Sequence, residues 1–251
     1  MKLRNWIFML SIGILALTSC KKDSDESEPM PLIATETSDG ITSTFSYKDG
    51  RLDKIVNSDN SKTTFTYETS KVTVSEFESN GTISSTEIYT LNSKGLAISS
   101  TSTGKKKKSG NMITDRLMLK NSTSTTATYE YDANGYMTKV TMSDGTTTSS
   151  STLVITDGNP TSGTATSEGF TFNLLFAYFT DKTNTIGQEN EGTTFLGKQS
   201  KNLLKSATIS FIGYSVSSNY VYEYDSKNRV TNQTETDSDG NTHIVSYTFI
   251  N

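Results

Sequence analysis

The chain contains few of the residues that build most catalytic centres. Among its 251 residues, cysteine, histidine and tryptophan each occur once and proline occurs three times. One histidine and one cysteine cannot supply the several nitrogen and sulfur ligands of a zinc site. Any Ser-His-Asp or Cys-His arrangement would need His243, which starts the apolar-alternating stretch "HIVSYTF". We therefore expect no metal, no cofactor and no enzymatic activity.

Apolar residues and basic charge are also scarce. The hydrophobic fraction is 32%, and the formal net charge is −4. Ordinary globular domains are ~45–50% apolar when glycine is counted, so this chain has little material for a core. A nucleic-acid partner would normally require a strongly basic face, and we expect none. The length suits one large all-β domain.

The N-terminus has the pattern of a targeting segment. Lys2 and Arg4 precede the apolar run "WIFMLSIGILAL", which is shorter than the ~20 residues of a bilayer span. The run ends in "LTSC", which is similar to a bacterial lipoprotein signal. That resemblance implies a signal peptide over 1–19 and lipid attachment at Cys20. Through this lipid the protein would be bound to a membrane, which is its expected partner. An ordinary secretory signal is the alternative.

Residues 20–40 are expected to form a flexible tether, because the stretch is polar and contains Pro29 and Pro31. Its acidic residues resemble the export tag of Bacteroidetes-type lipoproteins, which implies the outer membrane and its outer surface. The periplasmic face is the alternative, since any tether can be charged. These acids are Asp23, Asp25, Glu26 and Glu28.

The remainder, 41–251, is predicted to be a single all-β domain. In "TTATYEY" the residues Ala127, Tyr129 and Tyr131 alternate with Thr and Glu, which is typical of a half-buried strand. "IVSYTF" near the C-terminus alternates in the same way. Asn-Gly and Asp-Gly pairs separate such stretches and favour tight hairpins, since both residues tolerate positive φ. The pattern predicts a long antiparallel meander of ten or more strands, curled into a barrel-like or open sheet.

One hairpin motif recurs along the chain. "TYEYDANGYMTKV" (128–140), "VYEYDSKNRVTNQ" (221–233) and "TFSYKDGRLDKIV" (44–56) each place an aromatic pair directly before a turn. Asn228 takes the turn position that Gly135 holds in the first copy, because asparagine also tolerates the left-handed conformation. The repeat is therefore architectural.

This motif resembles the YD repeats of large bacterial shell proteins. Together with the lipobox and "LGKQSKNLLKSATIS" (196–210), it resembles more closely a family of Bacteroidetes-type lipoproteins of unknown function with a porin-like fold. The resemblance implies a curled sheet or barrel and no particular activity. The loop "GKKKKSGN" (104–111) departs from the family pattern.

The candidate ligand platform is the apolar segment "GFTFNLLFAYF" (169–179). Its aromatic residues share strand parity, and either fill the core or present rings to a glycan or protein partner. The connection at about 180–202 is long for a β domain, and we expect recognition there. The platform residues are Phe170, Phe172, Phe176 and Tyr178.

Several functions stay open beside a non-catalytic binding or structural role. Paired carboxylates could hydrolyse a glycan, although the acids are expected mostly in turns and on polar strand faces. The stretch 235–246 faintly resembles a calcium loop, but its twelfth position is Ser246, so a hairpin is expected. The basic run Lys105 to Lys108 is expected either to lie in solvent or to contact an anionic surface. A membrane-embedded barrel is a third alternative, against which the Thr- and Ser-rich strand faces argue.

Overall fold

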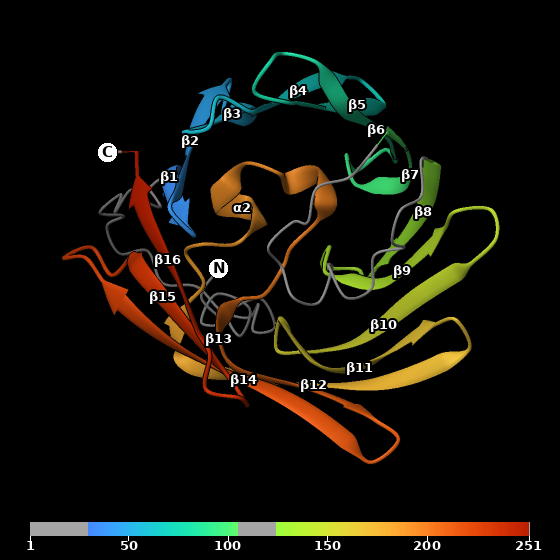
Figure 1. Cartoon of the computed structure of the whole chain (residues 1–251), viewed down its shortest axis with the longest axis vertical. Coiled ribbons are helices and arrows are strands. Elements are labelled where there is room, and N and C mark those ends of the chain that lie inside the picture. The colour runs from blue at the N-terminus through green and yellow to red at the C-terminus, as the bar shows by residue number, and fades with distance from the viewer. Residues whose placement is uncertain (1–29, 105–123, 251) are drawn as a thin grey trace, which may run out of the picture.

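The computed structural model describes residues 30–104 and 124–250. Each strand pairs antiparallel with its neighbours in sequence, and β1 pairs with β16, so the sheet closes into a barrel (Figure 1). The predicted all-β meander is thus confirmed, and the barrel is closed. The strands are β1 Ile33–Ser38, β2 Ile41–Lys48, β3 Arg51–Asn57, β4 Lys62–Glu68, β5 Lys71–Phe77, β6 Ile83–Leu91, β7 Ala97–Gly104, β8 Ser124–Tyr131, β9 Met137–Ser143, β10 Thr148–Thr156, β11 Asn159–Ser167, β12 Phe170–Thr183, β13 Asn202–Phe211, β14 Tyr214–Tyr224, β15 Val230–Asp237 and β16 Thr242–Phe249.

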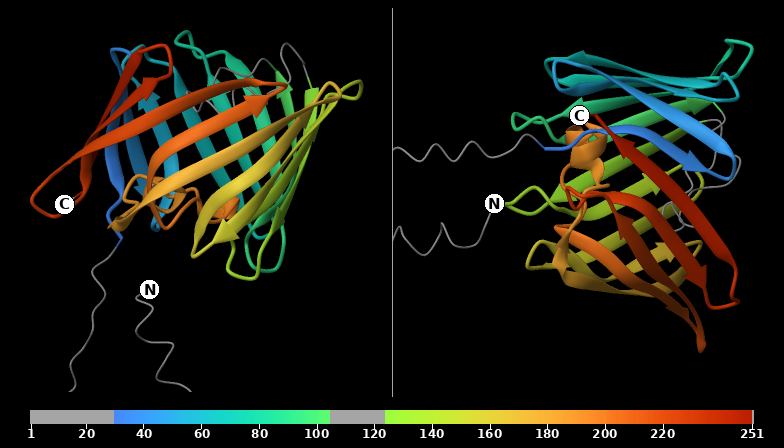
Figure 2. Two further views of the ribbon diagram at one scale, coloured as in Figure 1. Left: turned by 90° about the horizontal axis from the view of Figure 1, so that it is seen from below. Right: turned by 90° about the vertical axis from the view of Figure 1, so that its left-hand side faces the viewer.

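The connection between β12 and β13, residues 184–201, differs from the tight turns. It contains the short helix α2 (Gln188–Glu191) and the 3-10 turn η3 (Thr194–Leu196). We call it the insert. Figure 1 shows α2 inside the ring of strands, and the side views of Figure 2 place the insert at one end of the barrel. That end is called the insert end and the opposite one the far end.

The contacts of the insert identify the inner face of the sheet. Phe195 of η3 packs against Tyr67 and Tyr89, so these two tyrosines point inward. Side chains alternate along a strand, and the register carries the assignment around the barrel. For example, Tyr67 is opposite Val72, which is opposite Tyr89. Aromatic and aliphatic side chains therefore gather on the inner face.

The outer face carries mainly threonine and serine, together with some lysines and exposed apolar side chains such as those of Ile88, Val154 and Leu175. Hydroxyl pairs bridge neighbouring strands there, as between Thr35 and Thr248 at 2.7 Å and between Thr152 and Thr164 at 2.8 Å. Such β-branched cross-strand pairs stabilise a solvated sheet face. The predicted polar face is the outside of the barrel.

Two expectations about segment boundaries are corrected. β1 begins at Ile33, which is fully buried, so the barrel begins inside the stretch 20–40 expected to be the tether. The segment 180–202 is not a surface loop: its first residues extend β12, and Phe195 is buried. Cys20 and the run Lys105 to Lys108 lie outside the described residues. No helix within the described ranges is long and apolar enough to cross a bilayer.

Candidate binding site on the inner face

The insert is held in a socket of aromatic rings. The centroid of Phe195 lies 5.0 Å from that of Tyr89 and 6.3 Å from that of Tyr67, both in edge-to-face geometry. Val72 and Ala97, which have no exposed surface, complete the cluster. The aromatic residues that precede the turns thus serve a common purpose, because all these turns lie at the insert end. They form the wall against which the insert packs.

Polar contacts fix the helix of the insert to the start of the barrel. Asn190 is 4% exposed, and its side-chain amide donates to the Pro31 carbonyl at 2.9 Å. The same side chain accepts a hydrogen bond from the Gly187 backbone N–H at 3.2 Å. The Tyr47 hydroxyl donates to the Ile33 carbonyl at 2.7 Å. A buried amide satisfied on both sides specifies one position for the insert.

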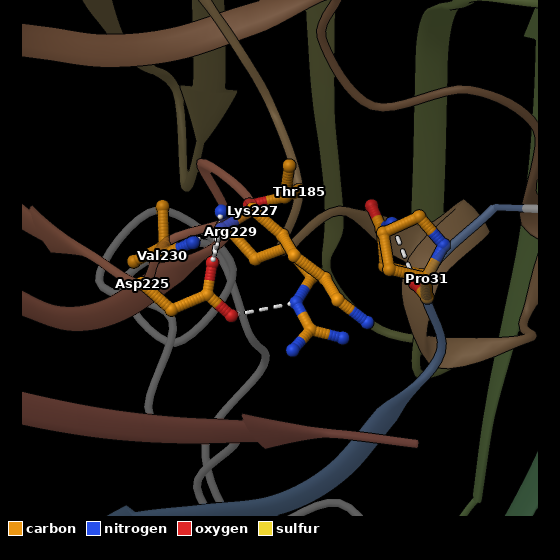
Figure 3. A network of polar contacts seen from close by, with 7 residues as sticks. Pro31, Thr185, Asp225, Lys227, Arg229 and Val230 are labelled. Carbon is orange, nitrogen blue, oxygen red and sulfur yellow. Dashed lines mark hydrogen bonds and ion pairs between the residues drawn. The ribbon is translucent and has the colours of Figure 1, made fainter. Parts of the chain in front are cut away.

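A second group of contacts joins the insert to β15 (Figure 3). The Val230 backbone N–H donates to the Thr185 hydroxyl at 3.0 Å. The preceding turn is closed by Asp225, which accepts from the Arg229 backbone N–H at 2.9 Å and from Arg229 Nε at 2.7 Å. These hydrogen bonds and the ion pair hold the pKa of Asp225 below its usual value. The turn sequence thereby positions the first residue of β15 for contact with the insert.

Two glycines permit the insert to approach the wall closely. Gly197 has φ of 85°, and a Cβ there would meet the Tyr131 ring at 2.6 Å and the Gly135 carbonyl oxygen at 2.7 Å. Gly192 has φ of 78°, and its Cβ would lie 2.9 Å from the Tyr47 ring. Any side chain would displace the insert from the socket.

Most acids lie in turns and on the outer face, as expected, but a few carboxylates lie on the inner face. Ser85 donates a hydrogen bond to Glu76 at 2.6 Å, and Ser100 donates to Glu87 at 2.7 Å. Both serines are buried. Along β4 to β7, where these acids lie, the register places no lysine or arginine at an inward position. The sequence signal for this inward placement is strand parity, because Glu76 has the same parity as Val74 and Glu87 the same parity as Tyr89.

Two carboxyl groups, Glu36 on β1 and Glu191 on the insert, interact electrostatically across the boundary between the wall and the insert. Burial raises the pKa of Glu191 to about 7, the Glu36 carboxylate adds to the rise, and the Thr193 hydroxyl opposes it. Burial likewise raises the pKa of Glu36, against which His243 acts. Burial and a neighbouring carboxylate both disfavour the charged form of a carboxyl group. No short sequence pattern marks this pair, because Glu36 and Glu191 meet only when the insert enters the barrel.

The four predicted platform residues share the inner face of β12 but lie in two places. Phe172 packs with Phe211 at 4.9 Å between ring centroids, and Phe170 packs with Phe211 at 5.4 Å. Phe170 and Tyr214 are 50% and 80% exposed. Phe170, Phe172, Phe211 and Tyr214 form a group at the far end that we call the rim aromatics.

The other two platform residues lie towards the insert end. Phe176 is buried with Ala165, Leu174 and Ala207, and Tyr178 packs against this cluster. Burial raises the pKa of Tyr178 well above its usual value. These two side chains support the wall and do not reach the far end.

His243 and the stretch that resembles a calcium loop are structural features. His243 Nε2 lies 2.9 Å from the Ser38 hydroxyl oxygen, across the seam between β1 and β16. Asp237 accepts hydrogen bonds from the backbone N–H groups of Asp239 and Asn241, both at 2.9 Å, which closes the expected hairpin. No group of His, Asp or Glu within the described part of the chain has an arrangement that could hold a metal ion.

Two shallow hollows lie on the surface of the described part of the chain. One of about 280 Å³ lies between the insert and the neighbouring turns, lined among others by Lys94, Asp132, Glu189 and Lys198. The other lies on the outer wall beside Val154 and Leu175. Neither coincides with the rim aromatics.

The closed antiparallel barrel with an inner insert defines a porin-like fold. The chain is similar to a porin-like protein from Bacteroides uniformis ATCC 8492 of known crystal structure, with a TM-score of 0.62 and 18% identity. The alignment covers 87% of this chain and 96% of that protein. No family model and no curated protein sequence matches the chain.

Proposed function

We propose that the protein is a lipid-anchored barrel of the cell envelope that binds a glycan chain at its far end without hydrolysing it. The observation that carries the proposal is the group of rim aromatics. These rings come from three adjacent strands, two of them (Phe170 and Tyr214) are exposed, and they offer flat apolar faces on an inner face that also carries hydroxyl and carboxylate groups. Binding sites commonly combine apolar rings with a few polar groups in this way.

The position of these rings favours a chain-like ligand. They lie on the concave inner face of the barrel, where a flat protein surface cannot approach. A single glycan chain or an extended peptide is narrow enough to enter. Sugar rings stack on aromatic faces and also need hydrogen bonds, so we assign the site to a glycan.

The lipid anchor is supported by the "LTSC" motif at Cys20 and by the tether composition. A porin-like fold is compatible with an outer-membrane or envelope location. The outer face, rich in Thr and Ser, supports a barrel surrounded by water, because an embedded barrel has an apolar outer band. A Cys20→Ala variant should lose incorporation of labelled fatty acid and move to the soluble fraction.

Calorimetric titration with envelope and host polysaccharides tests the binding site. Replacing Phe170 and Phe211 by alanine should weaken binding at least about tenfold, as expected for central aromatic contacts. The matched control replaces Leu175 and Val221, which are 61% and 66% exposed on the outer face. Equal loss of binding in both double variants would refute the site.

A glycan hydrolase is the second candidate, and the pair Glu36 and Glu191 favours it. A carboxylic acid with a pKa of about 7 can act as a general acid, and Glu36 supplies the second carboxyl group that such hydrolysis needs. Product analysis of the bound polysaccharide distinguishes the two functions. Shortened chains that disappear in Glu191→Gln would establish hydrolysis, whereas intact chains support binding alone.

A further inference from the structure

We propose that the glycan enters the far end by one terminus and runs along the inner face of β14, so that the protein recognises the ends of linear chains. This assignment rests on the proposed glycan site at the rim aromatics and specifies which part of a glycan occupies it. It follows from the closure of the insert end and from the side chains that line the inner face below the rings.

The insert is tied to the wall all round its end of the barrel. Its backbone bonds to separate parts of the ring: Gly192 to Leu52 on β3, Lys198 to Gly135 in the turn after β8, and Lys201 to Gly158 in the turn after β10. Asn190, Phe195 and Thr185 add the contacts with the start of β1, with β4 and β6, and with β15. Figure 1 accordingly shows α2 within the ring of strands. This closes the insert end to a long chain, which has to enter and leave at the far end.

The inner face of β14 leads from the rim aromatics to polar side chains. Tyr214 and Tyr220 share this face, because they are an even number of residues apart on one strand. Tyr220 is opposite Glu235 on β15, and Glu235 is opposite His243 on β16. We call Tyr220, Glu235 and His243 the polar cluster.

The polar cluster has the groups that sugar hydroxyls require. A carboxylate accepts hydrogen bonds, whereas a tyrosine hydroxyl and a neutral imidazole can each donate and accept. Burial raises the pKa of Tyr220 well above its usual value and the Glu235 carboxylate adds to the rise, so the Tyr220 hydroxyl keeps its proton. The contact of His243 Nε2 with the Ser38 hydroxyl at 2.9 Å fixes the imidazole ring. Within the described residues His243 Nδ1 makes no hydrogen bond, which leaves it for a ligand.

Solvent reaches the polar cluster, in contrast to other polar groups of the inner face. The side chain of His243 is 35% exposed, and Tyr220 and Glu235 are partly exposed. Glu76, on β5, accepts its hydrogen bond from Ser85, which is buried. A ligand can therefore contact the polar cluster without first displacing a partner of that kind.

The depth of the polar cluster favours a chain that enters by its end. Tyr220 lies six residues beyond Tyr214, which corresponds to about 20 Å along the strand. A single sugar stacked on the rim aromatics cannot reach so far, whereas several sugar units in succession can. A chain lying across the far end would contact the rings with its middle and would not reach the polar cluster.

The number of protein molecules bound per chain tests the recognition of ends. Linear fractions of increasing length are prepared from the polysaccharide that binds in the calorimetric titration, and each is titrated with the wild-type protein. The number bound per chain should stay constant, because every chain has the same number of ends. A number that rises in proportion to chain length would show binding along the chain and would overturn the proposal.

Variants of the polar cluster test the path along β14. Replacing Glu235 and His243 together by alanine should weaken binding of the longest fraction at least about tenfold. The shortest fraction, which contacts only the rings, should bind as before and thereby shows that the variant is folded. Tyr220→Phe removes a single hydroxyl and should cause a smaller loss in the same direction. The matched control is Glu223→Ala, since Glu223 is exposed on the outer face of β14.

The outcomes separate this proposal from the function on which it rests. Unchanged affinity of the double variant and of Tyr220→Phe for the longest fraction overturns the path along β14. Binding that depends on Phe170 and Phe211 but rises in number with chain length refutes the recognition of ends and leaves the glycan site intact. If no polysaccharide binds the wild-type protein, the glycan site itself is refuted, and the recognition of ends with it.

Discussion

Replacing Glu191 by glutamine should stabilise the barrel and remove part of its pH dependence. Glu191 lies on the insert inside the ring of strands, where burial and the Glu36 carboxylate raise its pKa to about 7 from an ordinary value of 4.5. The folded protein therefore prefers this side chain neutral. Glutamine keeps the size and remains neutral at every pH.

The sign of the effect follows from proton uptake. Between pH 4.5 and 7 the folded chain retains a proton that the unfolded chain has already released, so the free energy of unfolding falls as pH rises. Above pH 7 this contribution is constant. A rise from 4.5 to about 7 corresponds to at most about 3 kcal/mol, and water reaching the half-buried side chain reduces it. We expect Glu191→Gln to gain about 2 kcal/mol over the wild type at pH 8 and little at pH 4.5.

Urea unfolding followed by far-ultraviolet circular dichroism provides the measurement. The single tryptophan, Trp6, lies in the expected signal peptide, so tryptophan fluorescence cannot be used on the mature chain. Glu189→Gln on the same helix is the control, and its pH profile should follow the wild type. A Glu191→Gln profile parallel to that of the wild type, or lower stability at pH 8, would refute the reasoning.

Three further substitutions test the packing of the insert and turns. Phe195→Ala should destabilise the barrel by about 3–5 kcal/mol in urea titrations, because it empties the tyrosine socket. Phe170 is half-exposed, so Phe170→Ala should cost less than about 1 kcal/mol in the same assay. Asn190→Ala should cost about 1–3 kcal/mol and speed hydrogen exchange of the insert amides, because the Gly187 N–H and the Pro31 carbonyl lose their partner. Asn228 has φ of 58°, so Asn228→Ala should lower the stability by about 1 kcal/mol while Asn228→Gly leaves the melting temperature within a few degrees.

The hairpins could be predicted from the sequence because their chemistry is local. In "YEYDANGYM" the turn is specified by Asp132, which accepts hydrogen bonds from the backbone N–H groups of Asn134 and Tyr136, both at 2.9 Å. Asn228 adopts the expected left-handed conformation in the second copy. Alternation also assigned Tyr129 and Tyr131 to one face, which is the inner one.

Closure of the barrel and the position of the insert could not be predicted in this way. β1 pairs with β16 through residues such as Thr35 and Thr248, which are 213 positions apart, and no local pattern marks such a pairing. The insert has few apolar residues and resembles a polar loop in sequence. Its burial depends on Phe195 and Asn190 finding partners on strands far away in the chain.

The four aromatic residues of the candidate platform lie on one face of β12, as their parity predicts, but parity does not show that they divide into two groups. Phe170 and Phe176 have the same parity and differ only in their height along β12. The first is exposed at the far end, and the second is buried against Ala207. Periodicity gives the face of a strand and contains no information on the depth at which a side chain lies.

The seam between β1 and β16 has a consequence for folding and assembly. The other pairings join strands that are neighbours in sequence, so most of the sheet can form as local hairpins. Closing a segment of 213 residues costs about 3 kcal/mol more chain entropy than closing a five-residue turn, so we expect the seam to form last. Until then β1 and β16 are unpaired edges that can bind each other in different molecules. Slow closure at high protein concentration should therefore yield domain-swapped dimers, in which each seam is built from two chains.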